Sequence, residues 1–218
     1  NATNLFHTAG TWQGAATLNG VLDWTGGTLA PQLTIAPGST LKLSGNAAKT
    51  LGSGGVITNA GTVTWTSGQF NLGGSPTFYN QPGALFDVQF DGTVFQSSAG
   101  TSTFRNEGTY RKSAGSGTHT IQIGSFVNSG TVAVTSGVIG FVTTILSASG
   151  VGNSFSADAG ASVLFAQAFS SICGFTNTTF SGLGLKTITN SGVTSVTGTI
   201  NATNLFHTAG TWQGAATL

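Results

Sequence analysis

A short motif recurs along this 218-residue chain and limits what it can fold into. The motif is an apolar residue, any residue, Asn, any residue, then Gly, usually Thr, and a second apolar residue. Its copies lie at 57–63, 104–110, 126–132 and, more loosely, 188–193. The Asn and Gly residues of this series are Asn59, Gly61, Asn80, Gly83, Asn106, Gly108, Asn128, Gly130, Asn190 and Gly192. Neighbouring copies are often about 22 residues apart, which predicts a stack of repeated coils.

The segments around the motif alternate between apolar and polar residues. Examples are residues 39–44 (STLKLS), 61–66 (GTVTWT) and 130–135 (GTVAVT). This alternation is typical of strands with one buried face, and no stretch keeps apolar residues at helical spacing. We therefore predict an all-β, single-stranded parallel β-solenoid with about 22–25 residues per coil.

Stacked coils place equivalent residues about 4.8 Å apart, so that like residues form columns. We predict one apolar column of Ile57, Phe78, Phe104, Phe126 and Ile188, and a second of Val63, Leu85, Tyr110 and Val132. The Asn residues are expected at turns, bonded to the Asn of the next coil, and the Gly residues are expected to supply positive φ angles. Lys112 aligns with inward positions, which indicates either a bulge or a wet corner.

Residues 1–18 recur without a substitution as residues 201–218. We expect residues 1–200 to be one full repeat of eight to nine coils, and residues 201–218 to begin the next repeat. The chain would then be a window cut from a longer tandem array. Two forms of assembly remain open: one covalent array, or separate chains that dock end to end by strand addition.

Composition excludes some partners. Only 5% of the residues are charged and the net charge is +1, whereas binding to a phosphate backbone or an anionic membrane surface needs a basic face. No apolar run reaches the roughly 18 to 20 residues of a membrane-spanning helix. We therefore expect neither nucleic acid nor membrane as a partner.

Residues 38–45 (GSTLKLSG) and the repeated Asn-x-Gly-Thr-Val elements resemble the β-helical passenger regions of bacterial autotransporters, haemagglutinin-type adhesins and other giant surface repeat proteins. This resemblance implies a right-handed parallel β-helix. It also implies export and display at the cell surface.

Many β-helices cleave polysaccharides, so the few carboxylates matter. Asp87 and Asp91 would both point outward from a strand, roughly 13 Å apart, which exceeds the ~5–9.5 Å of a glycosidase pair. We interpret them as solvated charges. His7 and His119 lack ligand neighbours and are interpreted as turn or surface residues, and the single Cys173 as a small core residue. We predict no catalytic, metal or cofactor site.

Two surface features leave alternatives open. Residues 105–112 contain Arg105, Glu107, Arg111 and Lys112, which form either a solvated face or a lateral contact between fibres. Trp12 and its copy Trp212 are expected to fill the core, with sugar binding as the weaker alternative.

The leading hypothesis is a structural, non-enzymatic extracellular filament of stacked repeats, whose partners are further copies of the same repeat. The second is an adhesin or glycan-binding passenger with its binding surface in loops, for example at residues 142–154. The third is a polysaccharide lyase.

Overall fold

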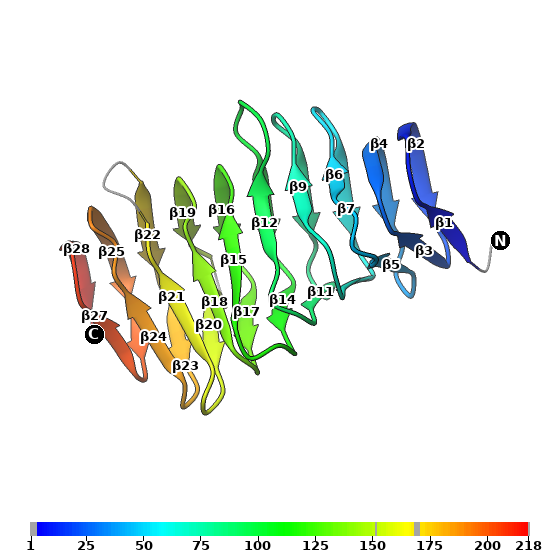
Figure 1. Ribbon diagram of the computed structural model, residues 1–218. Helices are drawn as coiled ribbons and strands as arrows, with labels where there is room; N and C mark the ends of the chain where they lie inside the picture. The colour runs from blue at the N-terminus through cyan, green and yellow to red at the C-terminus, as the bar shows by residue number, and fades with distance from the viewer. Residues whose placement is uncertain (1–3, 151, 168–170, 218) are drawn as a thin grey trace.

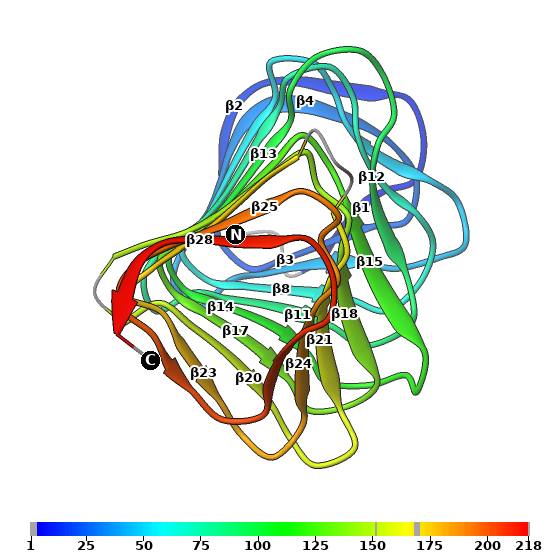
Figure 2. The same ribbon diagram turned by 90° about the vertical axis from the view of Figure 1, so that its left-hand side faces the viewer.

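In each full turn the chain runs along three flat faces before it reaches the next coil (Figures 1 and 2). The computed structural model describes residues 4–150, 152–167 and 171–217. These residues form a parallel β-solenoid of about nine turns and contain no helix, which confirms the predicted fold class. The described part of the chain accordingly has no helix long and apolar enough to cross a membrane.

The strands lie on three faces of the solenoid. Face 1 is a ten-stranded parallel sheet of β1 (Leu5–His7), β3 (Val21–Trp24), β5 (Thr40–Leu43), β8 (Thr62–Trp65), β11 (Leu85–Val88), β14 (Thr109–Lys112), β17 (Thr131–Val134), β20 (Ser154–Ala157), β23 (Thr179–Ser181) and β26 (Asn201–Ala202). Face 2 contains β6 (Lys49–Leu51), β9 (Phe70–Leu72), β12 (Thr93–Gln96), β15 (Thr118–Gln122), β18 (Val138–Phe141), β21 (Ser162–Phe165), β24 (Leu185–Ile188) and β27 (Leu205–His207). Face 3 contains β7 (Val56–Asn59), β10 (Thr77–Asn80), β13 (Thr103–Asn106), β16 (Ser125–Asn128), β19 (Ile145–Ala148), β22 (Ile172–Thr176), β25 (Val193–Thr199) and β28 (Thr211–Thr217).

Two longer strands connect faces 2 and 3. These are β2 (Thr11–Leu18) and β4 (Gly27–Ile35), which run along both faces without a break. The first part of β4 pairs with β6 and its last part pairs with β7. Faces 2 and 3 therefore belong to one eighteen-stranded sheet.

The coils stack in parallel register. On face 1 the paired inward residues are Leu5, Leu22, Leu41, Val63, Phe86, Tyr110, Val132, Phe155, Phe180 and Ala202. From Leu22 onward the shortest coil runs from Leu22 to Leu41 and the longest from Phe155 to Phe180. A coil has roughly 22 residues, so the period inferred from the motif is the length of one turn.

The predicted apolar column is present for four of its five residues. Ile57, Phe78, Phe104 and Phe126 pair in succession on face 3 and are buried. Phe78 and Phe104 stack with ring centroids 4.7 Å apart, and each such buried side chain stabilises the fold by about 1.5–3 kcal/mol. Ile188 is also buried but lies on face 2, where it pairs with Phe165, so its assignment to this column was wrong.

The second predicted column needs one correction. Phe86, not Leu85, pairs with Val63 and Tyr110, whereas Leu85 points outward. The turn before β11 has two more residues than the corresponding turn before β8, so Ala84 rather than Gly83 occupies the position of Gly61. Alignment on the glycine therefore placed this coil one residue out of register.

Candidate functional site

A ladder of Asn side chains runs along the corner between faces 3 and 1. Nδ2 of Asn59 donates to Oδ1 of Asn80 at 2.8 Å, Asn80 donates to Asn106 at 2.8 Å, and Asn106 donates to Asn128 at 2.7 Å. The second N–H of each of the first three amides reaches a main-chain carbonyl, respectively that of Leu85, Thr109 and Thr131. All four side chains are fully buried. The ladder therefore satisfies its own polar groups and fixes the register of four successive coils.

Asn190 is not part of this ladder. It lies at the corner between faces 2 and 3, where its Nδ2 donates to the carbonyl of Val193 and its Oδ1 accepts from the backbone N–H of Gly192. In the ladder position the coils beyond Asn128 carry Ala148 and then Phe175. The ladder thus ends where apolar residues replace Asn.

The motif glycines differ from the expectation of positive φ. Only Gly83, which follows Pro82, has a left-handed backbone, with φ of 80°. Gly61, Gly108 and Gly130 lie outside the left-handed region, and a Cβ there would overlap carbonyl oxygens of the preceding coil. Glycine is therefore needed at these three positions because neighbouring coils approach closely, not because of the backbone conformation.

Two buried lysines bind main-chain carbonyls at the corner between faces 1 and 2. Nζ of Lys49 donates to the carbonyls of Ser44, Gly45 and Ala47 at 2.6, 2.9 and 2.8 Å. Nζ of Lys186 donates to those of Ser181, Gly182 and Gly184 at 2.8, 2.9 and 2.8 Å. Burial lowers the pKa of both ammonium groups.

These lysines were missed by the sequence analysis, although the sequence carries a signal for them. Both stand in the pattern Ser-Gly-x-x-x-Lys, at 44–49 and 181–186. Elsewhere at this corner an indole takes the same role, since Nε1 of Trp24 donates to the carbonyl of Gly26 and that of Trp65 to those of Ser67 and Gly68. The turn carbonyls are thus satisfied from inside the solenoid.

Lys112 points inward without a bulge, in register with Val88 and Val134. Its Nζ leaves the core at the corner, where it donates to the carbonyls of Ala114 and Gly115 and to Oδ1 of Asp91 at 2.8 Å. Neither alternative raised by the sequence describes this position, because the long aliphatic stem fills the core while only the ammonium reaches the turn.

Asp87 and Asp91 each bind their own cation. Nε and Nη2 of Arg111 donate to the two carboxylate oxygens of Asp87 at 2.8 and 3.0 Å. Burial raises the pKa of Asp87, but hydrogen bonds from Arg111 and Gln89 outweigh it and hold the pKa below its ordinary value. Asp87 is only 2% exposed, so its interpretation as a solvated charge was wrong.

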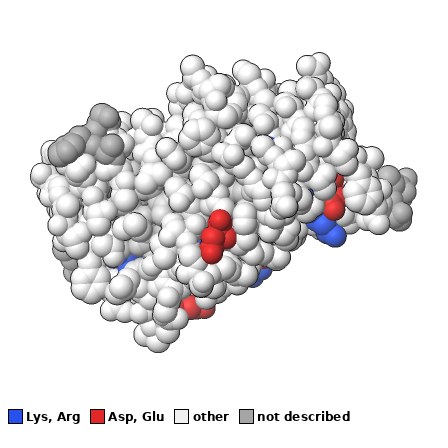
Figure 3. Space-filling model, in the orientation of Figure 1, with Lys and Arg blue, Asp and Glu red and all other residues white. Residues whose placement is uncertain are grey.

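The predicted charge cluster divides into three separate sites. Arg105 pairs with Glu107 and lies over the ring of Tyr79, Arg111 pairs with Asp87 on face 1, and Lys112 points into the core. Figure 3 accordingly shows only small, separate patches of charge on the face in view. In the described residues no group of three His, Cys, Asp or Glu side chains could hold a metal ion.

His119 is a core residue, not a turn or surface residue as the sequence suggested. It is fully buried, its Nδ1 lies 2.8 Å from the carbonyl of Gly92, and its Nε2 lies 2.6 Å from the hydroxyl of Tyr110. Since a carbonyl only accepts, Nδ1 carries the proton and Nε2 accepts from Tyr110. Burial lowers the pKa of His119 to about 4 and raises that of the Cys173 thiol to about 12, which leaves both groups neutral.

The expected loop at residues 142–154 is largely absent. Its described residues include β19, which pairs with β16 and β22 as an ordinary part of face 3. Among the described residues, this segment is therefore partly built into the wall of face 3.

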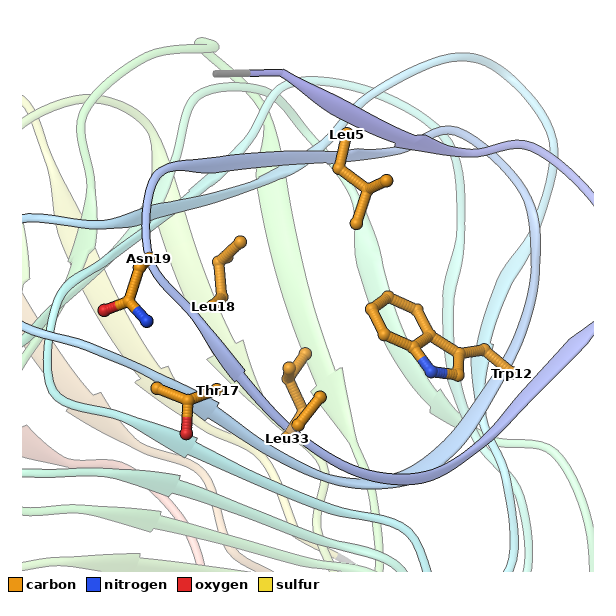
Figure 4. A pocket seen from close by; sticks show the side chains of 7 residues that line it. Leu5, Trp12, Thr17, Leu18, Asn19 and Leu33 are labelled. Carbon is orange, nitrogen blue, oxygen red and sulfur yellow. The ribbon is translucent and has the colours of Figure 1, made fainter. Parts of the chain in front are cut away.

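Both ends of the solenoid expose apolar core. At the N-terminal end a cavity of about 320 Å³ is lined by Leu5, Trp12, Leu18 and Leu33, among others (Figure 4). At the opposite end a cavity of about 390 Å³ is lined by Ala202, Leu205, His207 and Trp212. Among the described residues no strand pairs with the outer edges of these two terminal coils. Unpaired edges over an apolar interior are a template for further strands.

The recurring segment forms both of these terminal coils, but in different registers. Leu5 pairs with Leu22 on face 1, whereas its copy Leu205 pairs with Lys186 on face 2. In the C-terminal coil Ala202 holds the face 1 position, opposite Phe180. On face 1 the two identical segments are thus three residues out of register with each other.

The tryptophans of the two segments also lie on different faces. Trp12 pairs with Leu29 on face 2, and Trp212 pairs with Thr194 on face 3. Both indoles point inward and are partly buried against the core, in line with the expected core role.

No family model, no curated protein and no solved structure matches this chain. What the pairings define is a parallel β-solenoid of about nine turns.

Proposed function

We propose that this chain is a structural protein whose repeats stack end to end into an extracellular filament. The observation that carries the proposal is that residues 1–18 recur unchanged as residues 201–218, and that the described part of this second copy lies as a further coil on the same parallel stack. A solenoid that continues into a further copy covers both edges and both apolar cavities without a dedicated cap.

The interior of the chain supports a mechanical role. The Asn ladder, the stacked aromatic columns and the lysine-bound turns all hold one coil on the next. A regular column of such interactions suits a fibre because each coil needs only its two neighbours.

We further propose that the protein is not an enzyme. Asp87 is covered and paired with Arg111, and Asp91 is bound by Lys112 and by the backbone N–H of Gly117. A general acid or base must reach its substrate in a suitable protonation state. The hydrogen bonds to Arg111, Lys112 and Gly117 occupy both carboxylates, so they are poorly placed to exchange a proton with a substrate. Sparse charge likewise argues against nucleic acid or an anionic membrane as partner.

Electron microscopy of the native material tests the proposal. Nine turns at about 4.8 Å each predict an axial repeat of about 43 Å, and fibre diffraction should show the ~4.8 Å spacing along the fibre axis. Material that stays monomeric and shows no axial repeat would contradict a filament. Denaturing electrophoresis then separates the two forms of assembly, because a covalent array migrates as a giant species whereas docked chains dissociate.

An adhesin or glycan-binding role is the alternative, with the solenoid as a spacer. Glycan-array binding by the isolated chain, in the absence of filaments, would favour that role over the structural one.

A further inference from the structure

Two opposite charges stand side by side on face 1 without an ion-pair partner. Among the described residues, the three salt bridges use three of the six basic and three of the five acidic side chains. Lys49 and Lys186 bind turn carbonyls instead. The remaining charges are Asp23, Lys42 and Asp158. Asp23 and Lys42 pair in register on β3 and β5 and point outward, and Lys42 is exposed.

These two residues belong to a column of outward side chains that runs along face 1. In coil order the column consists of Phe6, Asp23, Lys42, Thr64, Asp87, Arg111 and Ala133. The charges read negative, positive, neutral, negative, positive, with Thr64 in the middle. When this order is reversed about Thr64, every negative position lies opposite a positive one.

We propose that face 1 is an interface with a second copy of this chain. The two copies pack face to face with antiparallel solenoid axes, and Thr64 of each lies at the two-fold axis. Asp23 then lies opposite Arg111 of the second copy, and Lys42 lies opposite Asp87 of the second copy. The two-fold axis makes each of these contacts twice. The interface uses the side of the solenoid, so this inference goes beyond the proposed filament and applies to an isolated chain.

The charges also fix the register of this pairing. A slip of one coil spacing in one direction sets Lys42 opposite Arg111 of the second copy. A slip in the other direction sets Asp23 opposite Asp87 of the second copy. Both slips bring like charges together, which costs free energy and excludes the wrong register. Two copies with parallel axes would instead set each charge beside its own counterpart.

The ion pair between Asp23 and Arg111 of the second copy carries most of the attraction. Arg111 already binds Asp87 of its own chain, but its side chain is 38% exposed. Only two of the five N–H groups of the guanidinium are used in that pair, so others can bind Asp23. Asp87 is 2% exposed beneath Arg111, so Lys42 of the second copy lies over a closed ion pair and adds less.

The other outward side chains of face 1 allow two sheets to approach. On the same five coils they are short or apolar, namely Val21, Thr40, Thr62, Leu85 and Thr109. The two-fold axis runs along β8, so the strands of the two copies are aligned, as in sheets that pack about 10 Å apart. Phe6, which is 63% exposed, lies opposite Ala133 of the second copy.

An exchange of the two neighbouring charges tests the pairing without a change in net charge. The double variant Asp23→Lys with Lys42→Asp keeps opposite charges adjacent in its own chain. It places like charges opposite Arg111 and Asp87 of the second copy. In sedimentation equilibrium we expect its dimerisation to be weaker by roughly tenfold or more. Asp158→Lys changes a charge at an exposed turn outside face 1 and should dimerise like the unmodified chain.

The same measurement can overturn the interface. An unmodified chain that stays monomeric at every concentration, or a charge-exchange variant that dimerises as well as the unmodified chain, would contradict it. Added NaCl should weaken the dimer because it screens the charges, and a dimer that strengthens with salt excludes this interface. Circular dichroism checks the fold. Asp23→Asn, which keeps an acceptor for the hydroxyl of Ser44, is the milder variant and should weaken dimerisation several-fold.

Nitroxide labels report the orientation of the two copies. Labels attached to Thr64→Cys should lie close together at the two-fold axis. Labels attached to Ser156→Cys should lie eight coil spacings apart, or roughly 38 Å. The buried Cys173, whose thiol pKa is raised to about 12, should stay unlabelled. A short distance at both positions in double electron–electron resonance would indicate parallel axes and overturn the antiparallel pairing.

Discussion

Nδ2 of Asn80 donates to Oδ1 of Asn106 at 2.8 Å, and Asn106 passes the same interaction to Asn128 in the next coil. Each interior amide of this ladder therefore both donates and accepts along the axis of the solenoid. Because the side chains are fully buried, no water replaces a lost partner.

Asn106→Ala should lower the free energy of unfolding by about 2–4 kcal/mol, since it leaves Oδ1 of Asn128 and the carbonyl of Thr131 without their donor. Urea unfolding followed by circular dichroism measures the change. Asn46→Ala, at an exposed turn position, is the control and should change stability by less than about 0.5 kcal/mol. Equal effects from the two variants would show that the ladder adds nothing.

Lys186→Met removes the ammonium that binds three turn carbonyls while it keeps most of the aliphatic stem. We expect a loss of about 2–4 kcal/mol, because those carbonyls lose a charged donor inside the solenoid. Lys42→Met is the matched control, since Lys42 is exposed on face 1, and it should be nearly neutral. If both lysines prove equally dispensable, the bonded ammonium has no stabilising role.

Gly108→Ala should destabilise the chain by about 1–3 kcal/mol or more, because the added methyl group would overlap the carbonyls of Gln81 and Ala84. Gly174→Ala is the control: nothing lies within 4 Å of the added methyl group. That variant should be neutral or slightly stabilising. Thermal unfolding of the two variants side by side measures the difference, and an unchanged midpoint for Gly108→Ala would contradict the close approach of the coils.

His119 should make stability fall as the pH is lowered from about 7 to 4. Its folded-state pKa of about 4 lies below the ordinary 6.5, so the unfolded chain takes up a proton in this window and the folded chain does not. The expected total is about 3 kcal/mol, with no further contribution below pH 4, where both states are protonated.

Urea midpoints measured at several pH values, for the unmodified chain and for His119→Gln, check this prediction. The glutamine variant keeps a donor and an acceptor but does not titrate, so the slope between pH 7 and 5 should largely disappear. Asp87, Asp91 and Glu107 also have pKa values below their ordinary 3.8 to 4.5, so their loss of stability is confined to about pH 5 and lower, and the part of the slope between pH 7 and 5 reports His119. A slope that persists in His119→Gln assigns the pH dependence to another group.

The sequence predicted the coil and its columns because alternation and the motif period are local properties. Ile57, Phe78 and Phe104 were placed correctly, because each lies on the same strand as the ladder Asn that follows it two positions later. Leu85 and Ile188 were misplaced because extra turn residues and a change of corner shift the register without changing the motif. Pairing across coils, not spacing along the chain, decides which residue enters a column.

The candidate site was predicted only in part. The Asn ladder followed from the repeat, but the burial of Asp87 and His119 did not, because it depends on Arg111 and Tyr110, which arrive from another strand, β14. Charges that are neighbours in sequence, such as Arg111 and Lys112, point to opposite sides of a strand and so belong to different environments.

By itself the sequence determined that the chain is an all-β stack of coils of roughly 22 residues, and that one segment recurs 200 positions later. Only the tertiary structure decided that this segment takes different registers at its two occurrences, with Leu5 on face 1 and Leu205 on face 2. The physical reason is that a strand's register is set by the hydrogen bonds and side chains of the coil on which it lies. Those neighbours differ at the two ends, although the residues do not.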